Sequence, residues 1–476
     1  MPNRVTQFAT PYLEKLRIKA DLGLFVQDQW KIQRLTLSYG LRFDLFNGYV
    51  PPQDIPATRF VPARNYAEVK NVPLWKDINP RLGGSYDLFG DGRTALKASF
   101  GRYVSKSGIT LQRNNNPITT SVTQVNRVWN DGNGNYVPDC ELTNPLANGE
   151  CGVISDLNFG QTRVTTRYGD DVLLGFGARE SNLDVTAEVQ HQLSPGISIN
   201  GGYYRNWAAH FQATDNERVE PADFNPFCIT APADARLPGG GGYQVCGLYD
   251  VSLAKFGAAN NVVTQASRFG EQSRVANFFS FGINTRLQSG IRLGGGVDTG
   301  RTVTNNCFVV DSPQQLVNCR QLWGFSPQTQ VKLFGSYPMP KDFIVSATFQ
   351  NVGGLPYEAN YNATNSEVAP SLGRNLAACG TRANCTATVT VPLITPYTQF
   401  EERRTQLDLR LTKLFKLSAK VRLQANFDLY NALNGTAFLG VNNTYGAQWR
   451  VPASSTASGA GVLNARLAQF SARLSY

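Results

Sequence analysis

The sequence predicts an all-β protein, a transmembrane antiparallel β-barrel. Apolar and polar residues alternate over long segments, and the connections between these segments alternate between short turns and long loops. No uncharged apolar run approaches the roughly 18 residues that a spanning helix needs. The alternation returns from Ile18 to Tyr476 without a linker or low-complexity tract. We therefore expect one large domain at residues 18–476, preceded by an N-terminal stub at 1–17 that belongs to an extracellular loop.

The clearest strand runs from Arg34 to Phe46, where every second residue is apolar and the others are mostly polar. Strands in soluble proteins usually have about five or six residues, so this strand is long for a soluble protein. Its length suits a tilted membrane strand of about 9 to 11 residues together with the residues at its two membrane interfaces. We predict thirteen such strands. Their alternating apolar residues lie within 20–26, 35–45, 82–88, 96–100, 183–189, 197–203, 279–283, 291–297, 331–337, 343–349, 407–411, 421–429 and 470–476.

The connections predict how the sheet is oriented. Short turns are expected at 31–33, 90–92, 194–196, 288–290, 338–342 and 416–419, and the other connections are long. Outer-membrane barrels have short periplasmic turns and long extracellular loops, so we expect the long loops to face outward. The polar face of the strands carries mixed charges, including Arg42, Asp184 and Asp428, which is typical of a wide, wet or plugged lumen. Most of these charges are expected to form cross-strand ion pairs.

Strand parity predicts that part of the barrel is missing. Single-chain bacterial barrels have an even number of strands with both ends in the periplasm, whereas the first strand here leads into a short turn and so descends from outside. An odd number of strands must then precede it. About nine more would complete a 22-stranded transporter barrel, a size that normally encloses a plug. We expect the plug and the early strands to be absent from this sequence.

Composition argues against several other functions. The formal charge is +10, but the 45 basic residues are scattered among 35 acidic ones without a binding motif, so we expect no nucleic-acid partner. The chain has two histidines, and no nucleophile, carboxylate dyad or metal cluster emerges. We predict that the protein is not an enzyme and has no catalytic or cofactor-binding residues, apart from one possible structural calcium site.

All eight cysteines fall in long loops, two in each of four loops. The simplest of the possible pairings joins the two members of each loop, which implies an oxidising compartment. The expected pairs are Cys140 with Cys151, Cys228 with Cys246, Cys307 with Cys319, and Cys379 with Cys385. A zinc site is not expected, because no close thiolate quartet or histidine pair is available.

One loop contains oxygen-bearing residues at alternate positions, Asp131, Asn133, Asn135 and Asp139, which could converge on calcium. The segment begins like an EF-hand loop, but Tyr136 replaces the required glycine and no glutamate stands at the last position. An Asx-rich turn beside Cys140 is the competing interpretation.

Several aromatic residues lie just outside the strands. They are candidates for gripping a ligand, although anchoring at the membrane interface is the competing interpretation. They are Trp129, Trp207, Phe211, Trp323 and Trp449. The first four are the predicted ligand-contacting aromatics.

Several motifs resemble the barrel of TonB-dependent receptors, especially the Oar-like group. They are Ile78-Asn79-Pro80-Arg81-Leu82-Gly83, the turn Gly90-Asp91-Gly92-Arg93-Thr94, Gly101-Arg102-Tyr103, the loop segment Leu237–Tyr243, and Asn426–Asn434 in the penultimate strand. The alternation of Phe470, Ala472 and Leu474 before a terminal Tyr476 also looks like the signal that the outer-membrane assembly machinery reads.

The resemblance implies energised uptake of an unidentified ligand across the outer membrane of a Gram-negative bacterium. In this family the inner-membrane TonB complex pulls on an N-terminal plug, and Oar-like members often carry a carboxypeptidase-regulatory-like domain before that plug. Neither is expected in this sequence, so this chain alone should be inactive in transport. A passive porin, or a structural or adhesive outer-membrane barrel, is the alternative.

Overall fold

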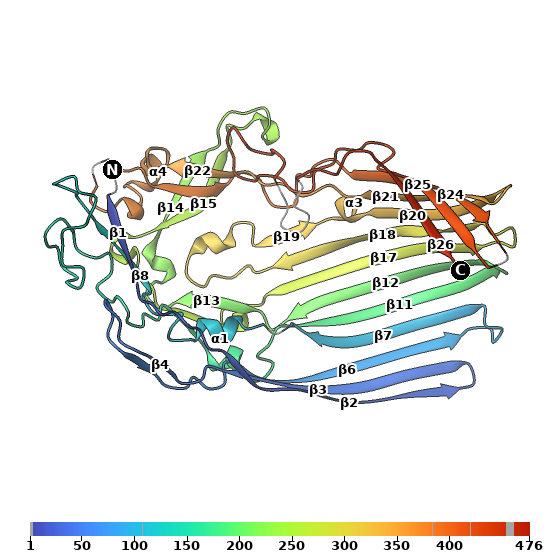
Figure 1. Cartoon of the computed structure of the whole chain (residues 1–476), viewed down its shortest axis with the longest axis horizontal. Coiled ribbons are helices and arrows are strands. Elements are labelled where there is room, and N and C mark those ends of the chain that lie inside the picture. The colour runs from blue at the N-terminus through green and yellow to red at the C-terminus, as the bar shows by residue number, and fades with distance from the viewer. Residues whose placement is uncertain (1–2, 107, 383, 419, 454–460) are drawn as a thin grey trace.

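The computed structural model describes residues 3–106, 108–382, 384–418, 420–453 and 461–476. Its main element is one large antiparallel sheet in which thirteen strands follow one another in chain order (Figure 1). These strands are β2 (Arg17–Ile32), β3 (Leu35–Tyr49), β6 (Leu74–Asp87), β7 (Thr94–Val104), β11 (Ser181–Ser194), β12 (Ile197–Ala209), β17 (Ser273–Arg286), β18 (Arg292–Asn305), β20 (Gln330–Met339), β21 (Phe343–Val352), β24 (Arg404–Lys416), β25 (Arg422–Tyr430) and β26 (Leu467–Ser475). The thirteen strands predicted from the sequence are confirmed.

Short turns and long loops lie at opposite ends of the sheet (Figure 1). The turns after β2, β6, β11, β17, β20 and β24 match the predicted positions within a few residues; Ala419, in the last of them, lies outside the described residues. At the β11–β12 turn, Gly196 has φ +87°, and a Cβ there would lie 2.3 Å from the carbonyl oxygen of Arg286. Glycine therefore lets this turn close against the neighbouring strand.

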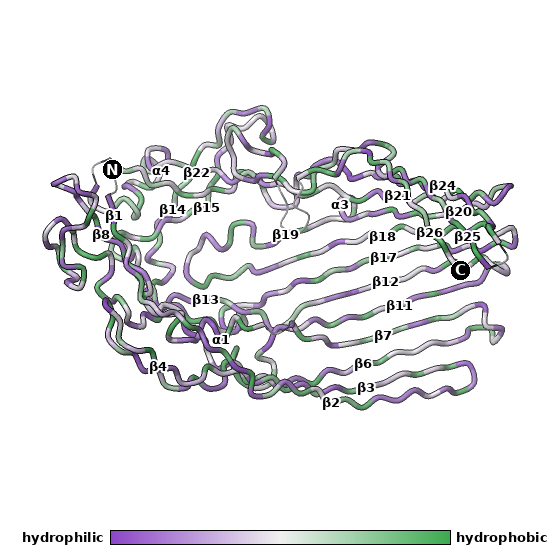
Figure 2. The backbone as a smooth tube through the Cα atoms, viewed as in Figure 1, coloured by the Kyte–Doolittle hydropathy of each residue, from purple (hydrophilic) through white to green (hydrophobic). Residues whose placement is uncertain are grey.

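Hydrophilic and hydrophobic residues alternate along the strands of the sheet (Figure 2). Phe281 on β17 is 60% exposed, and its cross-strand partners are Gly201 and Val297. One residue along, Ser280 pairs with Asp298 on the opposite face. Since strand residues alternate between faces, one face is the apolar surface expected against lipid, and the other, which we call the lumen face, carries the charged residues.

The sheet is open at both edges. β2 pairs only with β3, and β26 pairs only with β25, among the described residues. Two short strands also join the sheet at its loop end, β10 (Leu174–Phe176) beside β6 and β19 (Arg320–Trp323) beside β18. Within the described residues, no helix is long and apolar enough to cross a membrane.

The long loops contain secondary structure of their own. Short strand pairs and a three-stranded sheet form from β1 (Arg4–Phe8) with β8 (Gln124–Val128), β4 (Gln53–Ile55) with β5 (Arg64–Tyr66), β14 (Phe224–Thr230) with β15 (Gln244–Val251), β22 (Asn360–Thr364) with β23 (Thr388–Pro392), and β9 (Thr166–Tyr168) with β13 (Gln212–Asn216) and β16 (Asn261–Gln265). The helices are α1 (Thr110–Asn114), α2 (Asp170–Leu173), α3 (Phe325–Gln328) and α4 (Asn365–Leu372). Single 3₁₀ turns lie at Pro221–Asp223, Pro238–Gly240, Leu253–Lys255, Ala266–Arg268, Pro313–Leu316 and Ala377–Cys379.

Two ends differ slightly from the sequence prediction. β2 begins at Arg17, one residue before the predicted start at Ile18. β26 ends at Ser475, one residue before the predicted end at Tyr476. The predicted stub at 1–17 contains β1, which pairs with β8 in the loop between β7 and β11. The first described residues therefore pack among the long loops, while the C-terminus lies at the turn end of the sheet (Figure 1).

Candidate functional site

Three long loops pack together into one apolar core, which we call the loop core. It draws on described residues of the loops that follow β12, β21 and β25, which are far apart in sequence. Its buried members are Phe227, Ile229, Ala231, Leu237, Leu248, Tyr357, Ala359, Ala363, Val368, Leu376, Cys379, Val391, Leu393, Ile394 and Trp449. Because apolar burial is the main favourable term in folding, these loops form a folded layer at the end of the sheet.

Polar contacts join the same three loops. The indole of Trp449 donates to the carbonyl of Glu358 (2.7 Å), and the hydroxyl of Tyr243 donates to the carbonyl of Leu393 (2.7 Å). Tyr445 donates to the carboxylate of Asp234 (2.8 Å). Each bond crosses from one loop to another, so buried polar groups are satisfied between loops as well as within them.

Arg236 organises the exposed side of the loop core. Its guanidinium pairs with Asp234 (2.7 Å) and lies over the rings of Tyr445 (5.9 Å) and Trp449 (5.4 Å). Hydrogen bonds from Arg236, and then from Tyr445, hold the pKa of the Asp234 carboxyl well below its usual range. The carboxylate is therefore ionised at physiological pH and pairs with the guanidinium that lies over the aromatic rings.

The loop at 105–180 packs against the lumen face near the end of the sheet where the long loops lie. Phe46 and Trp75, on neighbouring strands, are buried with Ala178, and Leu111 of α1 packs against them. The indole of Trp75 donates to the carbonyl of Val172 (2.9 Å). This loop is thereby fixed to the barrel wall.

A buried ion cluster lies where β6 and β7 separate. Their ladder ends at Arg81 opposite Gly101, and beyond that point Asp77 is buried between Arg102 (3.2 Å) and Arg179 (3.1 Å). Arg102 also donates to the side chain of Asn79 (2.8 Å). Two guanidinium groups thus compensate one buried carboxylate, and Arg102 links β7 to β6 beyond the end of their ladder.

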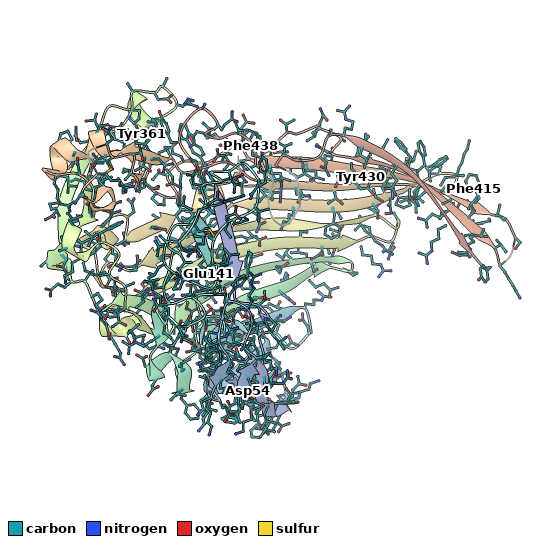
Figure 3. All side chains as sticks on the ribbon, turned by 60° about the vertical axis from the view of Figure 1, so that its left-hand side comes forward. Asp54, Glu141, Tyr361, Phe415, Tyr430 and Phe438 are labelled. Carbon is teal, nitrogen blue, oxygen red and sulfur yellow. A yellow bond between two sulfur atoms is a disulfide. The ribbon has the colours of Figure 1, made fainter. Side chains whose placement is uncertain are left out.

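A cavity of about 390 Å³, which we call the lumen pocket, lies between the wall and the loops. Phe278, Gln330, Val352 and Arg404 contribute from the strands, and Phe438 contributes from the last long loop. Figure 3 places Phe438 between Tyr361 in the loop layer and Tyr430 at the end of β25. The pocket is therefore at the junction of the wall and the loop layer.

The predicted calcium residues form a compact turn. Asp131 and Asn133 accept the backbone N–H of Asn135 (3.1 and 3.0 Å), and the amides of Asn133 and Asn135 donate to Asp139 (2.6 and 2.8 Å). Glu150 accepts the N–H of Gly132 (2.8 Å), so a further carboxylate lies beside the turn. These bonds describe an Asx-rich turn, and calcium binding stays a prediction.

The structure contains four disulfides, and each joins two cysteines of one loop. They are Cys140–Cys151, Cys228–Cys246, Cys307–Cys319 and Cys379–Cys385. These are the four local pairs expected from the sequence.

The aromatic candidates lie in separate places. Trp129 is buried in the loop at 105–180, where its indole donates to Glu150 (3.1 Å). Trp207 on β12 pairs with Leu183 and Val275 on the apolar face, with Arg205 over its ring (5.6 Å). The structure therefore does not bring the candidates into one site.

The two remaining candidates also have different surroundings. Phe211 follows β12, and its carbonyl accepts the N–H of Ala266 (2.8 Å). Trp323 lines the lumen pocket and stacks on Tyr397, with ring centroids 5.3 Å apart. Of the four, Trp323 is the one that contributes to the pocket.

The C-terminal aromatic residues are exposed on the last strand. Phe470 packs against Phe427 on the neighbouring strand, with ring centroids 5.0 Å apart, and Leu474 pairs with Leu423. Tyr476 is almost fully exposed. Their role as an assembly signal stays a prediction.

Sequence reasoning missed Arg404, Phe438 and Glu150 as members of these sites. Arg404 looks like one more charge of the alternating pattern, and Phe438 follows the penultimate strand without a motif. Glu150 lies beside Asp139 because the Cys140–Cys151 disulfide joins the two segments. The expected disulfide was the one signal that could have brought Glu150 to the turn.

The family model for the outer membrane beta barrel domain matches residues 2–275. No curated protein matches the chain. Among solved structures, the chain is similar to the outer membrane transporter YddB from Escherichia coli (8% identity, TM-score 0.44, 96% of this chain and 54% of that one). It is also similar to the ferripyoverdine receptor of Pseudomonas aeruginosa (10%, 0.46, 96% and 38%) and to the siderophore receptor PiuA from Acinetobacter baumannii (10%, 0.45, 95% and 42%).

This chain thus spans between 38% and 54% of the length of these three structures. The family match covers more than half of the 476 residues, and the sheet has the strand order, turns and loops of such a barrel. The chain therefore belongs to the outer membrane beta barrel domain family and lies in the outer membrane of a Gram-negative bacterium.

Proposed function

We propose that this chain forms part of the wall and the extracellular mouth of a TonB-dependent transporter of the Oar-like group, which imports an unidentified ligand. The observation that carries the proposal is the loop core, in which three long loops fold together next to a charged lumen face. A folded loop layer over a polar lumen suits selective capture of a ligand at the outer end of a wide barrel.

We propose that further strands complete the barrel. The open edges at β2 and β26 expose unpaired backbone N–H and C=O groups, and such edges do not persist within the hydrocarbon of a membrane. We propose that residues 18–476 form the C-terminal portion of a 22-stranded barrel and that residues 1–17 belong to an extracellular loop. In this proposal the plug, which contacts TonB, lies outside this sequence, and the chain alone is inactive in transport.

A strain that lacks the coding region of this chain tests the proposal. The wild-type and deletion strains, each with and without TonB, are grown in the same medium, and the medium is compared by mass spectrometry. A transporter predicts at least one compound whose depletion needs both this chain and TonB. Depletion that needs the chain but not TonB would contradict energised uptake.

A planar bilayer separates the proposal from a passive porin. The purified chain is reconstituted alone, and single-channel currents are recorded. An incomplete transporter wall predicts no uniform, stable conductance, whereas a porin predicts discrete channels of one size. Channels of one size would therefore favour the porin.

A further inference from the structure

We propose that the lumen pocket binds a small molecule that carries a carboxylate on a flat apolar body. The inference deepens the proposed function and rests on it, because it takes the ligand to enter the barrel from outside and to pass along the lumen face. The argument depends on three properties of the pocket: its place on the lumen face, a guanidinium without a partner, and an apolar, aromatic lining.

The pocket opens on the face of the wall that a ligand inside the barrel would meet. Arg404, Gln406 and Asp408 lie at alternate positions of β24 and so share one face, and Gln330 pairs with Asp298 on the charged face of β18. Phe438 and Leu439 of the last long loop complete the lining. The site is therefore shared between the rigid wall and the loop layer.

Close packing fixes the shape of the pocket. A Cβ at Gly354 would lie 1.8 Å from the carbonyl oxygen of Glu401, and a Cβ at Gly353 would lie 1.7 Å from that of Pro327. The two glycines thus let three segments approach each other closely. At about 390 Å³, the cavity falls within the range of known small-molecule sites, about 300 to 1,000 Å³.

Arg404 is the half-buried charged group of the lining, and it lacks a partner among the described residues. Its guanidinium is half-buried and makes no hydrogen bond or ion pair with any residue that the structure describes, and its Nε is shielded from water without an acceptor. Its neighbour Arg403, in contrast, donates to Asn351 (2.7 Å) and to the carbonyl of Ser326 (3.2 Å). A half-buried guanidinium gains most from a carboxylate, which can accept two parallel hydrogen bonds.

Trp323 is a second donor without an acceptor. Its Nε1 is buried and unpaired among the described residues, although its carbonyl accepts the amide of Gln328 (2.7 Å) and its ring stacks on Tyr397. An unsatisfied buried donor costs free energy that a ligand acceptor can recover after a small adjustment of the side chain. Both unpaired donors therefore favour a ligand that brings oxygen acceptors.

The rest of the lining favours an apolar ligand body. Phe278, Val352, Leu355, Pro356, Phe438 and Leu439 all line the cavity. Glu402 also lines it, but this carboxylate is exposed and keeps its contact with water. Apolar surfaces with a few placed polar groups are typical of sites that hold a small amphipathic molecule.

The test compares 1-naphthylacetate with its neutral analogue 1-naphthylacetamide. Binding of each is measured by isothermal titration calorimetry on the barrel that contains this chain, purified from the outer membrane into lipid nanodiscs. We expect the carboxylate to bind about tenfold tighter than the amide, and we expect Arg404→Gln to remove this difference. The matched control is Arg292→Gln, which removes the same charge from the lumen face at the turn end of β18 and should leave both affinities unchanged.

Near-ultraviolet circular dichroism reports whether each variant is folded. Should Arg404→Gln fail to fold, Trp323→Phe keeps the ring, removes the donor and should weaken the carboxylate about threefold or more. The inference is overturned if acid and amide bind equally, if neither binds the folded protein, or if folded Arg404→Gln and Trp323→Phe keep the original preference for the acid. Uptake by the wild-type and deletion strains is a separate readout. TonB-dependent uptake without naphthylacetate binding refutes only the proposed pocket ligand. Naphthylacetate binding without TonB-dependent uptake refutes only the proposed transport function.

Discussion

Arg450 and Glu401 form a two-point ion pair, with Nε–Oε1 and Nη2–Oε2 both at 2.8 Å, that joins the last long loop to the loop before β24. The ring of Tyr357 lies 4.2 Å from the guanidinium, and the Glu401 side chain is buried. The hydrogen bonds to Glu401 raise the pKa of Arg450. The pair thus fastens two loops to each other at one edge of the loop core.

Replacing Glu401 should loosen that joint. We expect Glu401→Ala to lower the free energy of local opening of residues 437–453 by about 2 kcal/mol, because Arg450 keeps its charge and loses its partner. Hydrogen exchange measured by mass spectrometry checks this. Glu402→Ala is the control, since that exposed neighbour makes no ion pair among the described residues; an equal effect of both substitutions would contradict the prediction.

The Cys228–Cys246 disulfide should stabilise the loop layer and not the wall. It lies in the β14–β15 hairpin, which contributes Phe227 and Leu248 to the loop core. Replacing both cysteines with serine should cost about 2 to 4 kcal/mol of loop stability, because the closed segment regains freedom when it unfolds. Limited proteolysis should then cut residues 210–272 faster, while the strands stay protected; faster cutting within the strands would count against this separation.

The apolar face should reject charge, and the lumen face should accept it. We expect Phe281→Arg to destabilise the protein in lipid by about 2 to 4 kcal/mol, since this exposed side chain lies on the apolar face that is expected to meet the hydrocarbon. The neighbouring Ser280→Arg, on the opposite face of β17, should have a much smaller effect. Denaturant unfolding in vesicles measures both, and equal losses would show that the faces have been assigned wrongly.

Acid should loosen the contact of His210 with the end of β11. His210 follows β12 and lies 3.1 Å from the hydroxyl of Ser181, and burial, followed by the nearby Arg102, lowers its pKa. His210 therefore takes up a proton more readily when the segment is open than when it is closed. The stability that neutral His210 contributes to the closed segment is complete above about pH 6.5 and is lost as the pH falls toward the lowered pKa of His210. Exchange protection of residues 177–181, corrected for intrinsic rates, should fall between pH 7 and pH 5.

His210→Asn provides the control for that pH dependence. Position 210 has φ +61°, a conformation that asparagine tolerates. The variant should show no loss of protection at residues 177–181 over the same pH range. A loss of the same size in the variant would assign the effect to another group.

Calcium binding can be followed through Trp129, whose indole donates to Glu150 next to the Asx-rich turn. If the turn holds calcium, adding the ion after treatment with a chelator should change the fluorescence, because carboxylate and amide oxygens would turn toward the metal. Asp131→Asn should weaken the response. A chain that responds to neither calcium nor chelator would make the turn a structural element alone.

The sequence predicted the wall far better than the mouth, for a physical reason. Strand residues such as Phe281 and Ser280 alternate because one neighbour is lipid and the other is the lumen, so each strand records its surroundings locally. The loop core depends on contacts such as Trp449 with Glu358 and Tyr243 with Leu393, between segments that share no periodic pattern. Likewise, nothing local to Arg404 indicates that it lacks a partner in the folded protein.

The disulfides and the loop core also differ in when they can form. Each disulfide closes within one loop, so it needs only that loop to have reached an oxidising environment. The loop core needs Trp449 from the loop that precedes the final strand β26, and such long-range contacts form late. During biogenesis the covalent links can therefore be complete while the mouth is still open, and joining the last loop to the other two would be the closing step of assembly.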